Sequence, residues 1–123
     1  LQKDANASSE FYINKLGQTQ ELEDQQTYKL LAARVLIREN KVEQSAALLR
    51  ELGELNDAQK LDRALIEARI SAAKNANDVV QNQLRALDLN KLSPSQKSRY
   101  YETLAIVAEN RKDMIEAVKD ING

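Results

Sequence analysis

The most constraining feature of this sequence is an asparagine that recurs between two helical runs. Asn40, Asn75 and Asn110 are spaced 35 residues apart, and each follows an apolar run and precedes a shorter amphipathic one. The segment from Leu30 to Leu52 shows this most clearly, because it has the pattern of a helix, a tight turn at Asn40 and a second helix. Asparagine suits such a turn because it tolerates a left-handed backbone conformation. The spacing therefore predicts helix-turn-helix units.

Composition favours helix along the whole chain. Three glycines and one proline interrupt a sequence rich in Ala, Leu, Gln, Glu, Lys and Arg, which have high helix propensity. We therefore expect an all-α fold of about seven helices, with a leading helix followed by three helix pairs. The expected ranges are about 7–17 for the leading helix and about 22–52, 57–87 and 94–121 for the pairs.

Local signals mark where several of these helices begin. Asn56 with Gln59, and Ser93 with Gln96, have the spacing of a capping box, and Asn6 is the expected cap of the leading helix. The third pair is expected to turn at Asn110. The residues that we expect to be buried in that pair are Tyr101, Leu104, Ala105 and Ala108, then Met114, Ala117, Val118 and Ile121.

The first helix of each pair is expected to lie between neighbouring units. Between Leu30 and Ile37 the chain is apolar on nearly every side, with Arg34 the only interruption, whereas the second helices carry a narrow apolar stripe. Ala33 and Ala68 stand seven residues before the turn asparagines, where small side chains would let two helices cross closely. The third unit has threonine at the corresponding position.

A period of roughly 34 residues in helix-turn-helix units resembles the tetratricopeptide class. Large and small residues alternate as in that class, although the chain has no tryptophan, Ser71 replaces a large residue and Lys119 replaces an aromatic one. The resemblance implies a right-handed solenoid in which the first helices line a concave surface. The residues that carry the match are Ala33, Leu36, Ser45, Leu49, Leu52, Ala68, Val80 and Leu84.

Several chemistries are disfavoured by what the chain lacks. It has no cysteine and no histidine, which removes thiolate nucleophiles, imidazole bases and the usual zinc ligands, so we expect no metal and no cofactor. Its net charge of -1 leaves no surplus of positive charge for a nucleic-acid-binding face. No apolar run approaches the roughly 20 residues of a membrane-spanning helix. Because the sequence begins at Leu1 without Met or a signal peptide, we expect it to be part of a longer protein.

Carboxylates are the only acid-base groups left for an enzyme. A carboxylate-dependent glycan hydrolase is one hypothesis, since paired acids cleave glycosidic bonds. Solvated charge near helix ends is the simpler interpretation, because neither cluster has apolar surroundings. The two clusters are Glu21, Glu23 and Asp24, and Glu51, Glu54 and Asp57. We therefore expect a protein that is not an enzyme.

On the concave surface, the candidate binding residues are Arg34, Arg38, Arg69 and Tyr100. Guanidinium groups could clamp a peptide carboxylate by bidentate pairing. Alternatively, the arginines lay their stems along apolar surface and pair with a nearby glutamate. The tyrosine pair Tyr100-Tyr101 could stack on sugars, although Tyr101 has the position of a core residue.

Short matches along the chain give a closer resemblance. The chain is similar to the N-terminal domain of the LpoA family, outer-membrane lipoprotein activators of a bifunctional peptidoglycan synthase in Gram-negative bacteria. The linker 55–59 is the most informative of these matches, which cover the chain from Phe11 onward. They are Phe11-Tyr12, the stretch 30–34, Glu39-Asn40-Lys41, the linker Leu55-Asn56-Asp57-Ala58-Gln59 and Ser98-Arg99-Tyr100-Tyr101.

The resemblance implies a non-catalytic periplasmic scaffold, anchored to the outer membrane by a lipidated N-terminal Cys that this sequence lacks. It implies that a C-terminal domain, also absent here, makes the main contact with the synthase, a class A penicillin-binding protein, and that peptidoglycan is a further candidate ligand. The alternative is a generic tetratricopeptide-like adaptor that binds an extended peptide in its concave groove.

Overall fold

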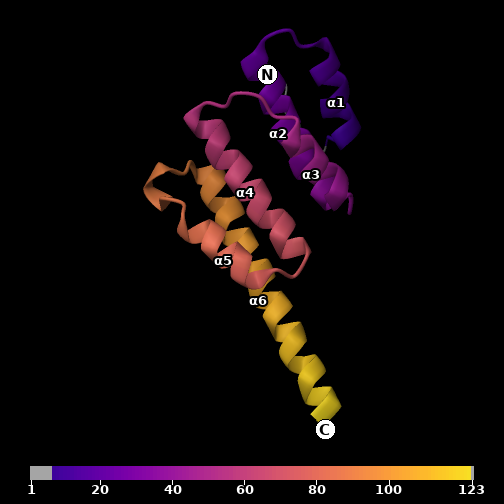
Figure 1. The fold of residues 1–123 in the computed structure, drawn as a ribbon, viewed down its shortest axis with the longest axis vertical. Helices are drawn as coiled ribbons and strands as arrows, with labels where there is room; N and C mark the ends of the chain where they lie inside the picture. Colours follow the sequence, from indigo (N-terminus) through magenta and orange to yellow (C-terminus); the bar gives the residue numbers. More distant parts are fainter. Residues whose placement is uncertain (1–6, 123) are drawn as a thin grey trace.

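The computed structural model describes residues 7–122, except for the side chains of Met114 and of residues 116–122. Within that range the ordered elements are all helices, with no strand (Figure 1). They are α1 (Ser9–Gln18), α2 (Leu22–Arg38), α3 (Val42–Arg50), α4 (Asp57–Ala73), α5 (Asn77–Arg85), the 3-10 helix η1 (Leu89–Lys91) and α6 (Pro94–Asn122). The all-α, tetratricopeptide-like prediction is confirmed, with α2–α3 and α4–α5 as helix pairs.

Both pairs turn at the predicted asparagine. Asn40 and Asn75 have φ angles of 62° and 59°, in the left-handed region. The turn is closed by a backbone hydrogen bond from the N–H of Lys41 to the carbonyl of Leu36, at 2.8 Å. The second turn has the same bond from Ala76 to Ser71, at 2.9 Å. These bonds satisfy carbonyls that the end of a helix leaves without a partner.

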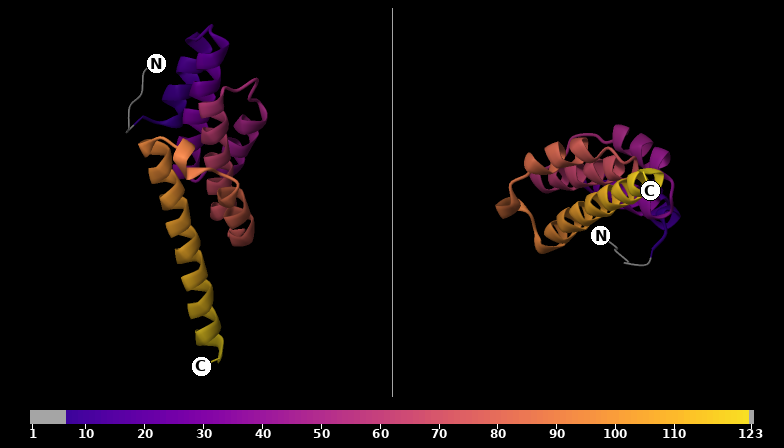
Figure 2. Two further views of the ribbon diagram at one scale, coloured as in Figure 1. Left: turned by 90° about the vertical axis from the view of Figure 1, so that its left-hand side faces the viewer. Right: turned by 90° about the horizontal axis from the view of Figure 1, so that it is seen from below.

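The third unit differs from the prediction, because α6 continues through Asn110 as a single helix (Figure 2). The expected turn and seventh helix are therefore wrong. A left-handed turn costs conformational energy, which is recovered when the next helix packs back against the preceding one. Beyond Asn110 the described side chains, those of residues 111–113 and Ile115, are exposed, so no such packing offsets the cost. Instead, the Asn110 Nδ2 donates to the carbonyl of Ala72 at 3.0 Å. The predicted inward side chains at 114, 117, 118 and 121 lie outside the described residues.

Capping boxes open α4 and α6 as predicted. Gln59 accepts from the N–H of Asn56 at 3.0 Å, and Asn56 accepts from the N–H of Gln59 at 2.8 Å. Ser93 and Gln96 make the same reciprocal pair. The leading helix is capped by Ser8, whose hydroxyl accepts from the N–H of residue 11, while Asn6 lies outside the described residues. The predicted start of that helix was therefore too early.

Three small cores follow one another along the solenoid. The first joins α1 to α2, the second joins α2, α3 and α4, and the third joins α4, α5 and α6. Each core is shared only by neighbouring helices, which is the arrangement expected of a helical repeat. None of the described helices combines the length and the apolar character needed to cross a bilayer.

The first helices α2 and α4 are buried on several sides, as predicted, and small residues lie where helices cross, whereas one face of α6 is exposed. Ala33 and Ala68 are both fully buried. Ser45 on α3 is also fully buried, and its hydroxyl donates to the carbonyl of Ala33 at 2.7 Å. By contrast, α5 buries only Val80 and Leu84. The packing is therefore tightest where the sequence has its small residues.

The capping glutamines also join successive units. The Nε2 of Gln59 donates to the carbonyl of Glu23 in the first turn of α2, at 2.9 Å. The Nε2 of Gln96 donates to the carbonyl of Ala58 in the first turn of α4, at 3.3 Å. Each side chain therefore caps its own helix with its oxygen and binds the preceding first helix with its nitrogen. We call these two contacts the glutamine links.

Candidate functional site

A groove of about 310 Å³ is bordered by the three first helices α2, α4 and α6. These helices are far apart in sequence, but α4 packs against both α2 and α6 (Figure 1). The floor of the groove is apolar and its walls are charged or hydroxylated. The lining residues are Arg34, Ile37, Arg38, Leu65, Ile66, Arg69, Ser95, Ser98, Arg99, Glu102 and Thr103.

The groove brings together three of the four predicted binding residues. Arg34 and Arg38 come from α2 and Arg69 comes from α4. Within the described part of the chain, no carboxylate forms an ion pair with any of these three arginines. The glutamate partner that the alternative interpretation requires is therefore absent among the described residues.

A fourth arginine, Arg99, lines the groove from α6. Its Nη2 lies 3.0 Å from the Oδ1 of Asp62, and the Nε2 of Gln96 donates to the same oxygen at 2.9 Å. The side chains of Arg99 and Asp62 are 21% and 28% exposed, so this is the least exposed ion pair among the described residues. Asp62 therefore holds Arg99 in a defined position.

Sequence reasoning missed Arg99 as a binding residue, although a signal was present. Asp62 stands three residues after Gln59, and Arg99 stands three residues after Gln96. Equivalent positions of stacked repeats face each other, so opposite charges at these positions predict a pair across the interface. Arg99 does not stand at the position of the third unit that the 35-residue spacing of Arg34 and Arg69 would indicate.

The positive charges in the groove act on one another. Partial burial, and then the positive charges of Arg99 and Arg38, lower the pKa of the Arg34 guanidinium. Tyr12 and Asp62 act in the opposite direction. The causes that lower the pKa are desolvation and like-charge repulsion, both of which would be offset by a bound anion.

Tyr100 is not among the residues that line the groove. Its side chain is half-buried and packs against the core between α4, α5 and α6, whereas Tyr101 is 56% exposed. The two rings meet edge to face, with 5.3 Å between their centroids. The prediction that Tyr101 belongs to the core was wrong, as it was for Ala105 and Ala108, because no described helix covers that face of α6.

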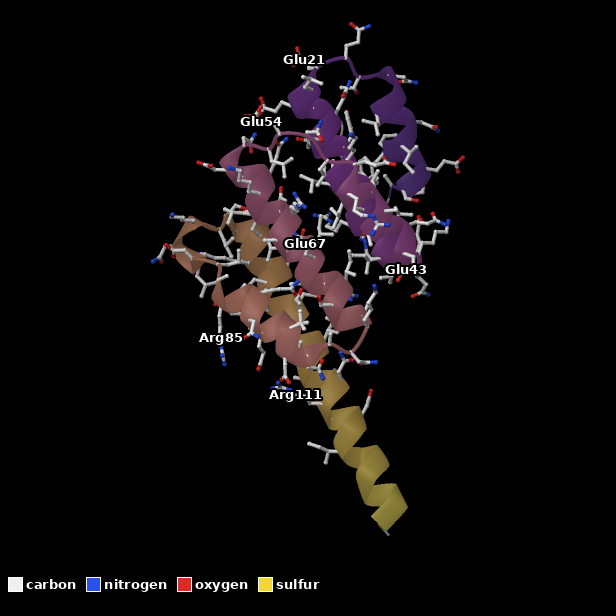
Figure 3. All side chains as sticks on the ribbon, in the orientation of Figure 1. Glu21, Glu43, Glu54, Glu67, Arg85 and Arg111 are labelled. Carbon is white, nitrogen blue, oxygen red and sulfur yellow. The ribbon has the colours of Figure 1, made fainter. Side chains whose placement is uncertain are left out.

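The two carboxylate clusters lie near the starts of α2 and α4, and Glu23 and Glu54, one from each cluster, line a surface pocket there. Figure 3 shows Glu21 and Glu54 on the outside of the molecule, at the end where those helices begin. Five of the six carboxylates are exposed, and Asp24 is half-buried. Such groups lack the apolar enclosure that a catalytic acid requires, which supports the interpretation as solvated charge.

A solenoid of paired helices with a charged groove on its first helices defines a tetratricopeptide-like interaction module. The family model described as "LppC putative lipoprotein" matches residues 2–121. The chain belongs to this LppC lipoprotein family.

Named relatives agree with this assignment. The chain is 98% identical over 119 residues to the penicillin-binding protein activator LpoA of Haemophilus influenzae, covering 97% of this chain and 21% of that protein. It is 60% identical over 119 residues to the protein of the same name from Histophilus somni strain 2336, covering 97% and 20%. The chain therefore spans about a fifth of the length of these relatives.

Solved structures give the same result. The LpoA N-terminal domain from Haemophilus influenzae matches with a TM-score of 0.86 and 98% identity, covering 95% of this chain and 53% of that one. The E. coli LpoA amino terminal domain matches with a TM-score of 0.80 at 30% identity, covering 85% and 47%. The fold is thus retained at much lower sequence identity.

Proposed function

We propose that this chain is a non-catalytic interaction module of a lipoprotein that activates a bifunctional peptidoglycan synthase, a class A penicillin-binding protein. The observation that carries the proposal is the 98% identity, over 97% of the chain, to a protein named as a penicillin-binding protein activator. The helical-repeat fold supports it, because such modules bind partners along extended concave surfaces.

Two features of the proposal concern the longer protein. The lipoprotein is anchored to the outer membrane by a lipidated N-terminal Cys, which places this module in the periplasm. A C-terminal domain outside this chain makes the main contact with the synthase. A signal peptide ending in a lipidation Cys is expected in the encoding gene upstream of Leu1; a gene without one would remove the periplasmic location.

A glycan-polymerisation assay tests the division of labour. The full-length lipoprotein is expected to stimulate the purified synthase, whereas this chain alone is not. Stimulation by the chain comparable to that of the full-length protein would show that the module itself activates. A full-length protein that does not stimulate would overturn the activator proposal.

The second candidate function is that of a tetratricopeptide-like adaptor, which binds an extended peptide and does not act on the synthase. The groove with Arg34, Arg38 and Arg69 favours it, since these arginines form no ion pair with a described carboxylate. Tyr100 has no direct part in this binding, because its side chain packs against the core between α4, α5 and α6. Crosslinking of the full-length lipoprotein to the synthase in cells would distinguish the two functions.

A further inference from the structure

The groove has more positive charge than its own carboxylates neutralise. Four arginines line it, and the one carboxylate among its described lining residues is Glu102, which is exposed on α6. Beside the groove, Asp62 pairs with Arg99, and Glu39, which follows Arg38, is hydrogen-bonded to Ser9. The groove therefore carries a surplus of about two positive charges, in a chain whose overall charge is -1.

The surplus is unfavourable for the free module. Like charges in a partly buried site repel one another more strongly than on an open surface, because solvent screens them less. The lowered pKa of Arg34, caused by burial and by Arg99 and Arg38, is one sign of this. An arrangement that weakens the free protein is typical of a site that a ligand completes.

The floor and the size of the groove restrict the ligand. Ile37, Leu65 and Ile66 are buried side chains that form an apolar strip along the floor of the groove, and Ser95 and Ser98 bring hydroxyl groups to the α6 wall. A volume of about 310 Å³ is at the small end of ligand pockets, which suits a short extended segment. A polyphosphate or sulfated chain would make no favourable contact with the apolar strip, and its negative charge would be repelled by Glu102.

We propose that the groove binds an extended acidic peptide segment of a partner protein, with two carboxylates paired to Arg34, Arg38 and Arg69 and an apolar side chain on Ile37, Leu65 and Ile66. Arg99, held by Asp62, closes the end of the site on α6. Guanidinium forks bind carboxylates in a bidentate manner, which gives direction as well as charge. This inference rests on the proposed role as an interaction module and names the ligand class of its groove.

The test is a peptide array probed with this chain. The array contains hexapeptides with two glutamates at every spacing and one leucine, each beside a copy in which glutamine replaces both glutamates. Some acidic peptides are expected to bind at least tenfold more tightly than their amide copies, since one charge-assisted hydrogen bond is worth about a factor of ten. An array with no such difference would overturn the proposal.

Two variants then assign the binding to the groove. Arg34→Lys keeps the charge and the aliphatic stem but removes the fork, so it is expected to weaken the best peptide about tenfold with an unchanged melting temperature. Arg85→Lys is the matched control, because it makes the same exchange outside the groove, and it should bind like the original chain. Arg85 is exposed on α5, and Figure 3 shows it pointing away from the other helices.

The outcomes separate this inference from the activator proposal. Equal weakening by both variants would show that the loss of a guanidinium group outside the groove has the same effect, and would overturn the groove assignment. Binding of heparin that survives Arg34→Lys and displaces the peptide would overturn the choice of a peptide ligand. Because the array contains no synthase, its failure leaves the polymerisation result untouched, and failure of the polymerisation assay leaves peptide binding untouched.

Discussion

Replacing Gln59 with alanine is expected to lower the free energy of unfolding by about 2 to 4 kcal/mol. Gln59 is 5% exposed, and its side chain makes three hydrogen bonds. Its Oε1 accepts from the N–H of Asn56 at 3.0 Å, and its Nε2 donates to the carbonyl of Glu23 and the hydroxyl of Thr27, both at 2.9 Å. Each bond contributes about 1 kcal/mol net, and the half-buried Thr27 hydroxyl would lose a partner.

The assay is urea denaturation followed by circular dichroism, with the slope m fitted alongside the free energy. An unchanged m would show that the folded and unfolded states keep their exposed surfaces. Gln44→Ala is the control, because Gln44 is exposed on α3, and its effect should stay within about 0.5 kcal/mol.

A second substitution separates the two ends of the same side chain. Gln59→Glu keeps an oxygen that accepts from Asn56 but removes the donor to Glu23 and Thr27, so it should lose the link while keeping the cap. If Gln59→Ala lowers the free energy of unfolding no more than Gln44→Ala does, the reasoning that the glutamine links stabilise the repeat is refuted. If Gln59→Glu matches the original chain, only the cap contributes.

Three further predictions test the packing, the pH dependence and the turn. Ala33→Leu should lower stability by about 1 to 3 kcal/mol through overpacking, because Ala33 is fully buried at a helix crossing; an unchanged thermal melt would show that the crossing is loose. Hydrogen bonds from the hydroxyl and N–H of Ser9 lower the pKa of Glu39, so the stabilisation is complete above the ordinary glutamate pKa of about 4.3 and is lost as the pH falls through the lowered value. Urea midpoints measured from pH 6 to pH 3 should fall more for the original chain than for Glu39→Gln, and parallel curves would contradict this assignment. Asn40→Gly should be tolerated at a φ of 62°, whereas Asn40→Val should lower the melting temperature, and equal melts would argue against a left-handed turn.

The two asparagine turns were predictable because the signal is local. At Asn40 and Asn75, an apolar run, a residue that tolerates positive φ and a second amphipathic run occur in order. Asn110 has similar neighbours but stays helical, because its side chain contacts Ala72 and Asn77 at the turn between α4 and α5. That contact depends on how α6 lies against the preceding pair, and one repeat considered alone does not contain this information.

The groove was predictable in part for the same reason. Arg34 and Arg69 are related by the repeat, so their common face followed from the spacing. Arg99 required knowing which residues of neighbouring first helices face each other, and Tyr100 was misplaced because successive residues on a helix point about 100° apart. A step of one residue along α6 therefore decided which tyrosine joined the core.

The glutamine links have a consequence for how the walls of the groove are held together. Helices α4 and α6 are joined by directional bonds at both ends, at Gln96 near their starts and at Asn110 beside the end of α4. Among the described residues, the hydrogen bonds between α2 and α4 lie only near the start of each helix, at Gln59 and Asn56. Their far ends meet through apolar side chains, whose attraction has no fixed direction. The wall formed by α2 is thus held to α4 by directional hydrogen bonds only where it begins, and Arg38, the last residue of α2, lies at the opposite end, where the Lys74–Glu43 ion pair joins α3 to α4.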